Sequence, residues 1–319
     1  MSLVLEQLNA EPALAWKTAV NVLGQAPGSP AAQKAAAITR LSPVVTQLLA
    51  GRDPTGRAYR KWIGSHWILS LLADLGCPPG DESLRPLMEE TYNTWLGIYH
   101  QKNIRQIAGR TRRCASQEGY AVWSSLRLGL ADGRTDELVS RLLKWQWPDG
   151  GWNCDKNPSA DSSSFMETLI PLRALSLYAR VSGDPHVAAT AERAAGIFLQ
   201  RRLFKRLHDG TVMDKHFVLL HYPAYWHYDI LFGLKVMAEA GYLSDPRCQE
   251  ALDLLESKCL PDGGFPADES FSRPTRPELS GYSTVQWGGT SQKRTNPFVT
   301  ADALFVLRMA GRMVSAIRL

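Results

Sequence analysis

Four polar residues of this 319-residue chain combine the residue types of acid–base chemistry with a common place in the sequence pattern. They are Glu118, Glu167, His227 and Asp229. Each lies near the predicted first turn of one class of helix, so packing those helices together would bring distant residues to one rim. Carboxylates are also favoured at helix starts for structural reasons, because free N–H groups and the helix dipole stabilise negative charge. Each of these residues could therefore have a structural role, as a helix cap or as the partner of an arginine, in place of a catalytic one.

An aromatic cluster surrounds His227 and Asp229. It consists of Tyr222, Tyr225, Trp226 and Tyr228. Aromatic faces stabilise a carbocation in a dry cavity, and they serve equally as core packing. Trp62 and His66 belong to a largely apolar predicted helix and are further candidates for substrate binding. A lone histidine in such a place is more often a hydrogen-bonded core residue.

Three arginines, Arg110, Arg112 and Arg113, immediately precede another predicted helix. Arginine side chains bind phosphate groups through paired hydrogen bonds. We therefore consider Arg113 and its neighbours as a candidate site for a diphosphate at the rim.

The cysteines argue for reduced thiols. The chain has five of them, with no Cys-x-x-Cys pair. Cys114 and Cys154, with Asp155 or one of the histidines, leave a Cys/Cys/His or Cys/Asp/His zinc assembly as an alternative, but the spacing is not that of a zinc finger. The chain also has no Asp-rich magnesium motif of the isoprenoid type. The sequence predicts no metal site and no cofactor.

Apolar residues recur at helical spacing almost throughout, and no alternating β-branched run is long enough to indicate a sheet. Helices are predicted over 12–24, 30–50, 59–75, 83–100, 116–130, 135–147, 164–181, 186–202, 226–240, 246–259 and 298–310. Two classes alternate. Those rich in Ala, Leu and Gly are predicted to form an inner layer, and they begin near Trp62, Glu118, Glu167, Asp229 and Thr300. The more charged helices are predicted to form an outer layer.

One turn phrase occurs twice between helices. The chain reads Pro148-Asp149-Gly150-Gly151-Trp152 and later Pro261-Asp262-Gly263-Gly264-Phe265. Proline fixes φ, and the glycines are free to adopt positive φ. Two copies between helical pairs indicate a repeat architecture. Trp147, Trp152 and Phe265 are expected to pack the turns against neighbouring helices.

The first copy, preceded by Gln146, resembles the QW-type repeat of squalene and terpenoid cyclases. The protein prenyltransferase β subunits, relatives of these cyclases, have similar turns. The resemblance spans roughly residues 55 to 311. Segments such as 114–119 and 221–229 also resemble a group of bacterial single-domain toroid proteins. The resemblance implies an all-α fold, an (α/α) toroid of inner and outer helices around a central cavity. Residues 1–55 would be a helical lead-in and residues 56–319 the toroid.

The resemblance also implies site residues. In class II cyclases an Asp-x-Asp-Asp motif opens an inner helix and donates the proton that starts cyclisation. Aligned on the Arg-Ala-Leu that follows, Glu167 falls where the last acids of that motif would lie. It would be the proton donor, with Glu118, His227 and Asp229 as polar partners. The chain has no Asp-x-Asp-Asp, and it lacks the Asp-x-Cys of the prenyltransferase zinc site.

Composition restricts the partners. A net charge of +5 is too mild to indicate nucleic acid. No apolar run approaches the roughly 18 residues of a spanning helix. The N-terminus lacks the layout of a secretory signal. We expect a cytoplasmic protein without a transmembrane segment. Peripheral membrane contact and the oligomeric state stay open.

Three functions are weighed. The first is an enzyme that binds an isoprenoid or another apolar substrate in the central cavity and converts it by acid-initiated cyclisation or isomerisation. The second is a non-catalytic binder of an apolar small molecule or lipid, whose rim carboxylates should all be paired. The third is a carbohydrate-active hydrolase or lyase, which needs two carboxyl groups across an open groove. The stretch 262–297 is expected either to cap the cavity or to be a surface insertion.

Overall fold

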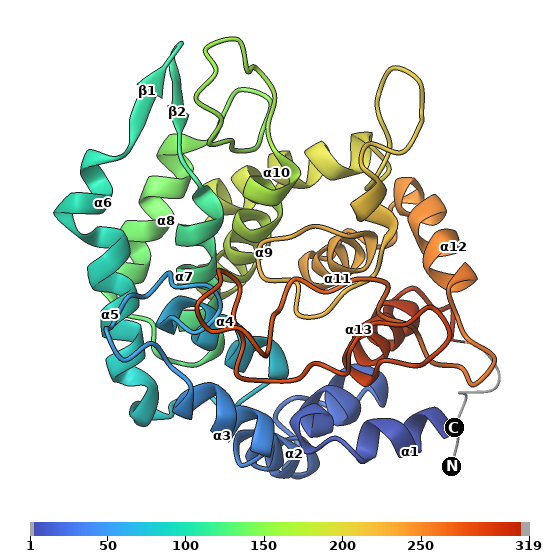
Figure 1. Ribbon diagram of the computed structural model, residues 1–319. Coiled ribbons are helices and arrows are strands. Elements are labelled where there is room, and N and C mark those ends of the chain that lie inside the picture. Colours follow the sequence, from blue (N-terminus) through green and yellow to red (C-terminus); the bar gives the residue numbers. More distant parts are fainter. Residues whose placement is uncertain (1–2, 314–319) are drawn as a thin grey trace.

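Helices form nearly all the regular structure of residues 3–313, the part of the chain that the computed structural model describes (Figure 1). They are α1 (Leu3–Asn9), α2 (Pro30–Arg40), α3 (Pro43–Ala50), α4 (Ser65–Leu75), α5 (Arg85–Leu96), α6 (Ile98–Lys102), α7 (Ala115–Arg127), α8 (Gly133–Trp145), α9 (Phe165–Ser182), α10 (Pro185–Gln200), α11 (Ile230–Ala240), α12 (Gln249–Ser257) and α13 (Pro297–Met309). The mainly helical class is as predicted. Residues 314–319 of the predicted second segment lie outside the described residues. No helix in the described part is long and apolar enough to span a membrane.

Five helices, α4, α7, α9, α11 and α13, form the inner layer. They pack side by side in chain order, and α5, α8, α10 and α12 each pack on the outside of one of them (Figure 1). The starts of α7 and α9 meet where the Ser116 N–H donates to Glu167. The ends of α9 and of its neighbour α11 also meet, since Arg180 near the end of α9 donates to the carbonyl of Glu239 near the end of α11. Helix starts therefore gather at one end of the layer.

Caps set several of these starts. Asp229 accepts a hydrogen bond from the Phe232 N–H at 2.7 Å and so caps α11. Asn296 caps α13 in the same way, and Pro297 at the first helical position needs no N–H partner. At the far end of α11, Gly241 takes φ +88°, which stops the helix.

The two repeat turns have the same hydrogen bonds. The Trp147 N–H donates to Gly151 O at 2.8 Å, as the Leu260 N–H donates to Gly264 O at 2.9 Å. The aromatic residue after each turn then donates its N–H to a threonine hydroxyl at the start of the next inner helix. Trp152 donates to Thr168 at 3.1 Å and Phe265 to Thr300 at 2.8 Å. Each turn thus fixes an outer helix relative to the inner helix that follows.

Several predicted boundaries were wrong. The predicted helix 30–50 is divided by Ser42-Pro43, because proline cannot continue a helix and the serine caps a new one. Residues 12–24 form a 3-10 turn (Pro12–Leu14) and a π-helical turn (Lys17–Val22). The structure also has a hairpin that was not predicted, of β1 (Arg105–Ile107) and β2 (Arg110–Arg112). Its two-residue turn takes positive φ at Ala108 and Gly109, as tight hairpins require.

The loop 262–297 covers the end where the inner helices start. The Trp62 backbone N–H donates to Tyr282 O and its indole N–H donates to Phe271 O, both at 2.8 Å. Trp287, at 4% exposure, is buried under the same loop. Figure 1 shows this stretch crossing in front of α4, α11 and α13. These contacts fit a cap rather than a free surface insertion.

Trp152→Ala should lower the free energy of unfolding by about 3–5 kcal/mol, because it empties a core aromatic site. Trp152 is 1% exposed, and its indole N–H donates to Leu142 O at 3.0 Å. Denaturant unfolding followed by circular dichroism measures the change. Tyr99→Ala, at a residue that is 83% exposed, is the control and should have almost no effect. Equal effects of the two substitutions would contradict the packing described above.

Candidate functional site

Two cysteines and a glutamate meet at the rim where the inner helices begin. Cys114 precedes the first turn of α7, Cys154 follows the first repeat turn, and Glu167 lies in the first turn of α9. One sulfur or carboxylate oxygen from each lies within 4.8 Å of the others. All three side chains are half-buried. We call these three residues the rim triad.

Glu167 has no cationic partner among residues 3–313. Its carboxylate accepts a hydrogen bond from the Ser116 N–H at 3.0 Å, and the Cys154 thiol lies 3.7 Å from its other oxygen. Burial raises the pKa of Glu167, and the nearby charge of Glu118 adds to the rise. The environment therefore favours either the protonated acid or a positive ion bound beside it.

The two thiols of the rim triad interact directly. The Cys114 thiol donates to the Cys154 sulfur, which raises the pKa of Cys114 and lowers the pKa of Cys154. Burial and the Glu167 charge add to the rise at Cys114. Of the two thiols, Cys154 therefore has the lower pKa.

Glu118, by contrast, is fully buried and paired. Its carboxylate accepts from His100 Nε2 at 2.6 Å and from Arg113 Nε at 3.3 Å. Burial alone would raise the pKa of Glu118, but these two partners outweigh it and the pKa is lowered. Arg113 also donates to Gln117. Glu118 and Arg113 therefore form an ion pair that braces the start of α7.

The predicted arginine group does not converge. Arg113 points to Glu118, whereas Arg110 and Arg112 lie over the Trp147 ring, 5.5 and 4.4 Å from its centroid. The three residues are on one strand and the segment after it, where side chains alternate in direction. The structure gives no common diphosphate site for them.

His227 and Asp229 are near the rim but in different surroundings from Glu167. Asp229 is 1% exposed and accepts from the His221 ring Nδ1 and the His221 backbone N–H, both at 2.9 Å. His227 stacks between Trp226 and Phe271, and burial lowers the pKa of His227 to about 3. Asp229 thus caps α11 and orients His221, and His227 is held neutral.

The other predicted aromatic residues are mainly packing groups. Trp62 stacks on Tyr225 with ring centroids 3.8 Å apart, and this pair lies under the loop 262–297. Tyr228 donates its hydroxyl to Leu203 O at 2.6 Å. Trp62 and His227 also line an open groove of about 270 Å³ on the rim, together with Lys61 and Phe271.

His66 is a core histidine. It is 1% exposed and accepts a hydrogen bond at Nδ1 from the Trp95 indole at 3.2 Å. Burial lowers the pKa of His66 to about 3, so the ring is neutral. The Tyr59 ring packs against the His66 ring, with the two ring centroids 5.5 Å apart. His66 is therefore a packing residue and not part of the rim triad's surroundings.

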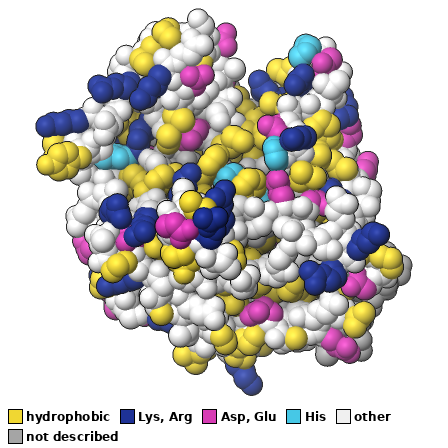
Figure 2. All heavy atoms as spheres, viewed as in Figure 1, with side chains coloured by type: hydrophobic (Ala, Val, Ile, Leu, Met, Phe, Trp, Pro, Cys, Tyr) yellow, Lys and Arg dark blue, Asp and Glu magenta, His cyan; other side chains and the backbone are white. Residues whose placement is uncertain are grey.

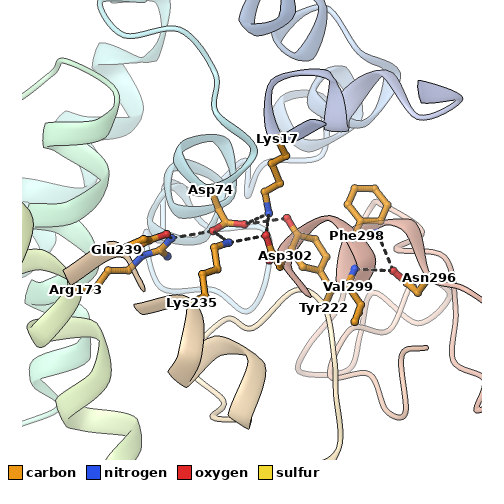
Figure 3. A network of polar contacts seen from close by, with 10 residues as sticks. All are labelled: Lys17, Asp74, Arg173, Tyr222, Lys235, Glu239, Asn296, Phe298, Val299 and Asp302. Atoms are coloured by element: carbon orange, nitrogen blue, oxygen red, sulfur yellow. Dashed lines mark hydrogen bonds and ion pairs between the residues drawn. The ribbon is translucent and has the colours of Figure 1, made fainter. Parts of the chain in front are cut away.

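A buried ion network crosses the interior between the inner helices (Figure 3). Lys17 is 0% exposed and contacts Asp74 at 2.7 Å and Asp302 at 2.8 Å, and Lys235 contacts the same two carboxylates at 2.7 and 2.9 Å. Arg173 joins Asp74 at 3.1 Å. We call these residues, with Glu239 and Tyr222, the central network.

The central network leaves little room inside. The enclosed cavity above it, on the rim side, has a volume of only about 30 Å³. Tyr120, Tyr222, Tyr225 and Asp229 are among its lining residues. That space suits one or two water molecules. Tyr222 belongs to the network itself, since its hydroxyl donates to Asp74 at 3.3 Å.

Figure 2 views the rim face in the same orientation as Figure 1. Hydrophobic, histidine and charged side chains are mixed around the hollow of this face. Such a mixed surface provides both apolar contact and titratable groups for a bound molecule.

The sequence did not reveal two features of this region. It offered Cys114 and Cys154 as alternative zinc ligands together with Asp155 or a histidine, and not with Glu167. It also gave no role to Lys17, Asp74, Lys235 or Asp302. The sequence contained a signal for these four residues, because charged residues in otherwise apolar helices are rarely buried without partners. Comparison of the chain with protein-family models, curated proteins and solved structures gave no match.

As pH rises, Glu167→Gln should gain stability relative to the parent protein, whereas Glu118→Gln should lose stability relative to it. Because the pKa of Glu167 is raised in the folded state, the metal-free parent loses stability as pH rises from the ordinary glutamate range through the raised value. Glu167→Gln removes that loss, so its melting temperature should gain on that of the parent as pH rises above the ordinary glutamate pKa of about 4.3.

The Glu118 variant is the matched control. A lowered pKa adds stability above the ordinary glutamate range, so Glu118→Gln should be less stable than the parent at neutral pH and approach it in acid. Thermal unfolding in a chelating buffer measures both. The same pH trend in the two variants would contradict these environments.

Proposed function

We propose that this protein is an (α/α)-toroid enzyme whose catalytic centre is a metal ion held by Cys114, Cys154 and Glu167 at the rim. The toroid rests on the order of the inner helices and on Lys17, which joins Asp74 of α4 to Asp302 of α13 and so links the first and last of them. The single observation that carries the metal is the 4.8 Å limit on the distances among the three ligand atoms.

The donor set fits a zinc-type ion. Two thiolates and a carboxylate are ligands that zinc prefers, and three protein ligands leave a fourth position for water or substrate. A bound cation would also offset the cost of ionising Glu167 in its buried place. When bound, such an ion would supply a site at which a thiol or water is deprotonated and held as a nucleophile.

The chain's own residues would position this centre. The Ser116 N–H holds one oxygen of Glu167, and the repeat turn before Cys154 fixes its backbone through Trp152 and Thr168. Arg113 pairs with Glu118 and favours its ionised form. This arrangement supplies a preformed ligand set, as precise metal sites require.

For the substrate we propose an apolar molecule of isoprenoid type, in line with the sequence resemblance. The enclosed cavity of about 30 Å³ is far below the roughly 300 Å³ of a small-molecule pocket. We therefore place the apolar part in the rim groove of about 270 Å³ beside Trp62, His227 and Phe271. The reaction class would be transfer of a prenyl group from a prenyl diphosphate to a thiolate or hydroxide nucleophile. A carbon–sulfur or carbon–oxygen bond forms, the carbon–oxygen bond to the diphosphate breaks, and diphosphate leaves.

The alternatives differ in what they require of the rim carboxylates. A pure binder should have all of them paired, and no cation within the described part of the chain pairs with Glu167. A glycoside hydrolase needs a second free carboxyl group, whereas Glu118 is bound by His100 and Arg113. Acid-initiated cyclisation with Glu167 as the proton donor is the second candidate. The raised pKa of Glu167 favours it.

A pair of substitutions separates the two candidates. Metal-free protein is titrated with zinc against a competing chelator, and turnover of a prenyl diphosphate is followed in parallel. The metal account expects one zinc per chain in the parent and at least tenfold weaker zinc binding in Cys154→Ser and Glu167→Gln, with loss of turnover in both. The acid account expects loss of turnover in Glu167→Gln only, because it does not need the thiol.

Cys259→Ser is the control, since Cys259 is half-buried and outside the rim triad. It should bind zinc like the parent. Zinc binding that survives Cys114→Ser and Cys154→Ser together would rule out this centre. Binding should also weaken as pH falls, because both thiols and the carboxyl group must lose their protons.

A further inference from the structure

Two cavities lie at the other end of the inner helices, on the far side of the central network from the rim. One, of about 200 Å³, is lined by Trp123, Leu177 and the last turns of α7 and α9. The second, of about 230 Å³, runs along α2 and is lined by Ala32, Ala36 and Pro78. Both are lined by Trp16, Pro27 and Arg127. They therefore meet at Arg127, and we call the pair the Arg127 hollow.

The first cavity has an excess of positive charge. Four cationic side chains line it, with two carboxylates, Asp74 and Glu239. The cations are Arg127, Arg173, Arg180 and Lys235. Arg173 and Lys235 are committed to the carboxylates of the central network. The remaining charge therefore belongs to the two arginines at the helix ends.

The side chain of Arg127 has no hydrogen bond or ion pair with any residue between 3 and 313. Its guanidinium lies over the Trp16 ring, 5.2 Å from the centroid. Burial lowers the pKa of Arg127, and the negative charge of Glu239 opposes that shift only in part. No carboxylate forms an ion pair with this guanidinium, because Glu239 is paired with Arg173, so an anion bound beside Arg127 would relieve the cost of its burial.

The second cavity has a different character. Apart from Gln33 and Arg127, its lining is apolar, and it includes Cys77 and Pro79 beside the Trp16 ring. A molecule with its charged group at Arg127 would therefore have an apolar surface available immediately next to it. The hollow matches a ligand with one anionic end and one apolar end.

We propose that the Arg127 hollow binds a single-chain amphiphile with an anionic head group, a fatty acid or an alkyl phosphate. The head group pairs with Arg127, with Arg180 nearby, and the chain lies along α2 beside Ala32 and Ala36. This site is independent of the metal centre, because α7 separates Cys114 from Arg127 by about 20 Å of helix. Failure of either proposal leaves the other standing.

A structural role for Arg127 is the competing explanation. Cations are favoured in the last turn of a helix, where the dipole is negative. Lys144 has the same position at the end of the neighbouring helix α8, but it is exposed and does not line the hollow. Lys144→Gln is therefore the matched control for Arg127→Gln, since both remove one cation from a helix end.

Calorimetric titration of the full chain with octyl phosphate and with octanoate tests the proposal. Octylammonium serves as a probe of opposite charge, and acetate serves as an anion without the long alkyl chain. We expect one anionic amphiphile per chain, and at least tenfold weaker binding of octylammonium and of acetate. Preference for octyl phosphate or octanoate identifies the head group as phosphate or carboxylate.

Arg127→Gln should weaken octyl phosphate binding at least tenfold, and Lys144→Gln should leave it unchanged. Gln33→Trp, on the exposed side of the second cavity, should occupy the space of the ligand's alkyl chain. It should therefore weaken octyl phosphate binding without altering the core. Thermal unfolding checks that the variants are folded. Equal binding of octylammonium, parent-like binding by Arg127→Gln, or equal losses in Arg127→Gln and Lys144→Gln would overturn the proposal.

Discussion

The buried ion pairs around Asp74 are the interaction on which the rest of the structure depends. Lys17, Lys235 and Arg173 all contact this one carboxylate, and they come from the N-terminal segment, α11 and α9. Partners in such a network are costly to remove, since one uncompensated buried charge destabilises a fold by about 3–5 kcal/mol. The contacts therefore fix the register of the inner helices and make residues before position 55 part of the interior.

The same network divides the interior into two ends with different chemistry. On the rim side, helix starts offer N–H groups, and the carboxylate of Glu167 and the thiols of Cys114 and Cys154 gather there. On the far side, helix ends carry arginines, and Arg127 lines a hollow whose carboxylates are paired with Arg173 and Lys235. Polar residues in the middle leave only about 30 Å³ of enclosed space between them. Function is thus expected at the two ends and not in the centre.

The sequence predicted the elements better than the contacts. Helical periodicity and the repeated turn identified the alternating inner and outer helices, and Trp152 and Phe265 are buried as expected. Periodicity could not show that Pro43 starts a second helix or that Lys17 enters the core. Helix starts gave Glu118 and Glu167 a common rim, but only packing shows that Arg113 pairs with one of them. The approach of Cys114 to Cys154 depends on the path of the chain through β2, where the sequence has no helical periodicity that would predict it.

A crystal structure of the zinc-loaded protein, with anomalous scattering recorded at the zinc edge, tests the central claim most directly. The account predicts a single strong peak between Cys114, Cys154 and Glu167, at about 2.3 Å from each sulfur and about 2.0–2.2 Å from a carboxylate oxygen. A peak elsewhere, or a disulfide joining Cys114 to Cys154 with no metal beside it, would contradict the account.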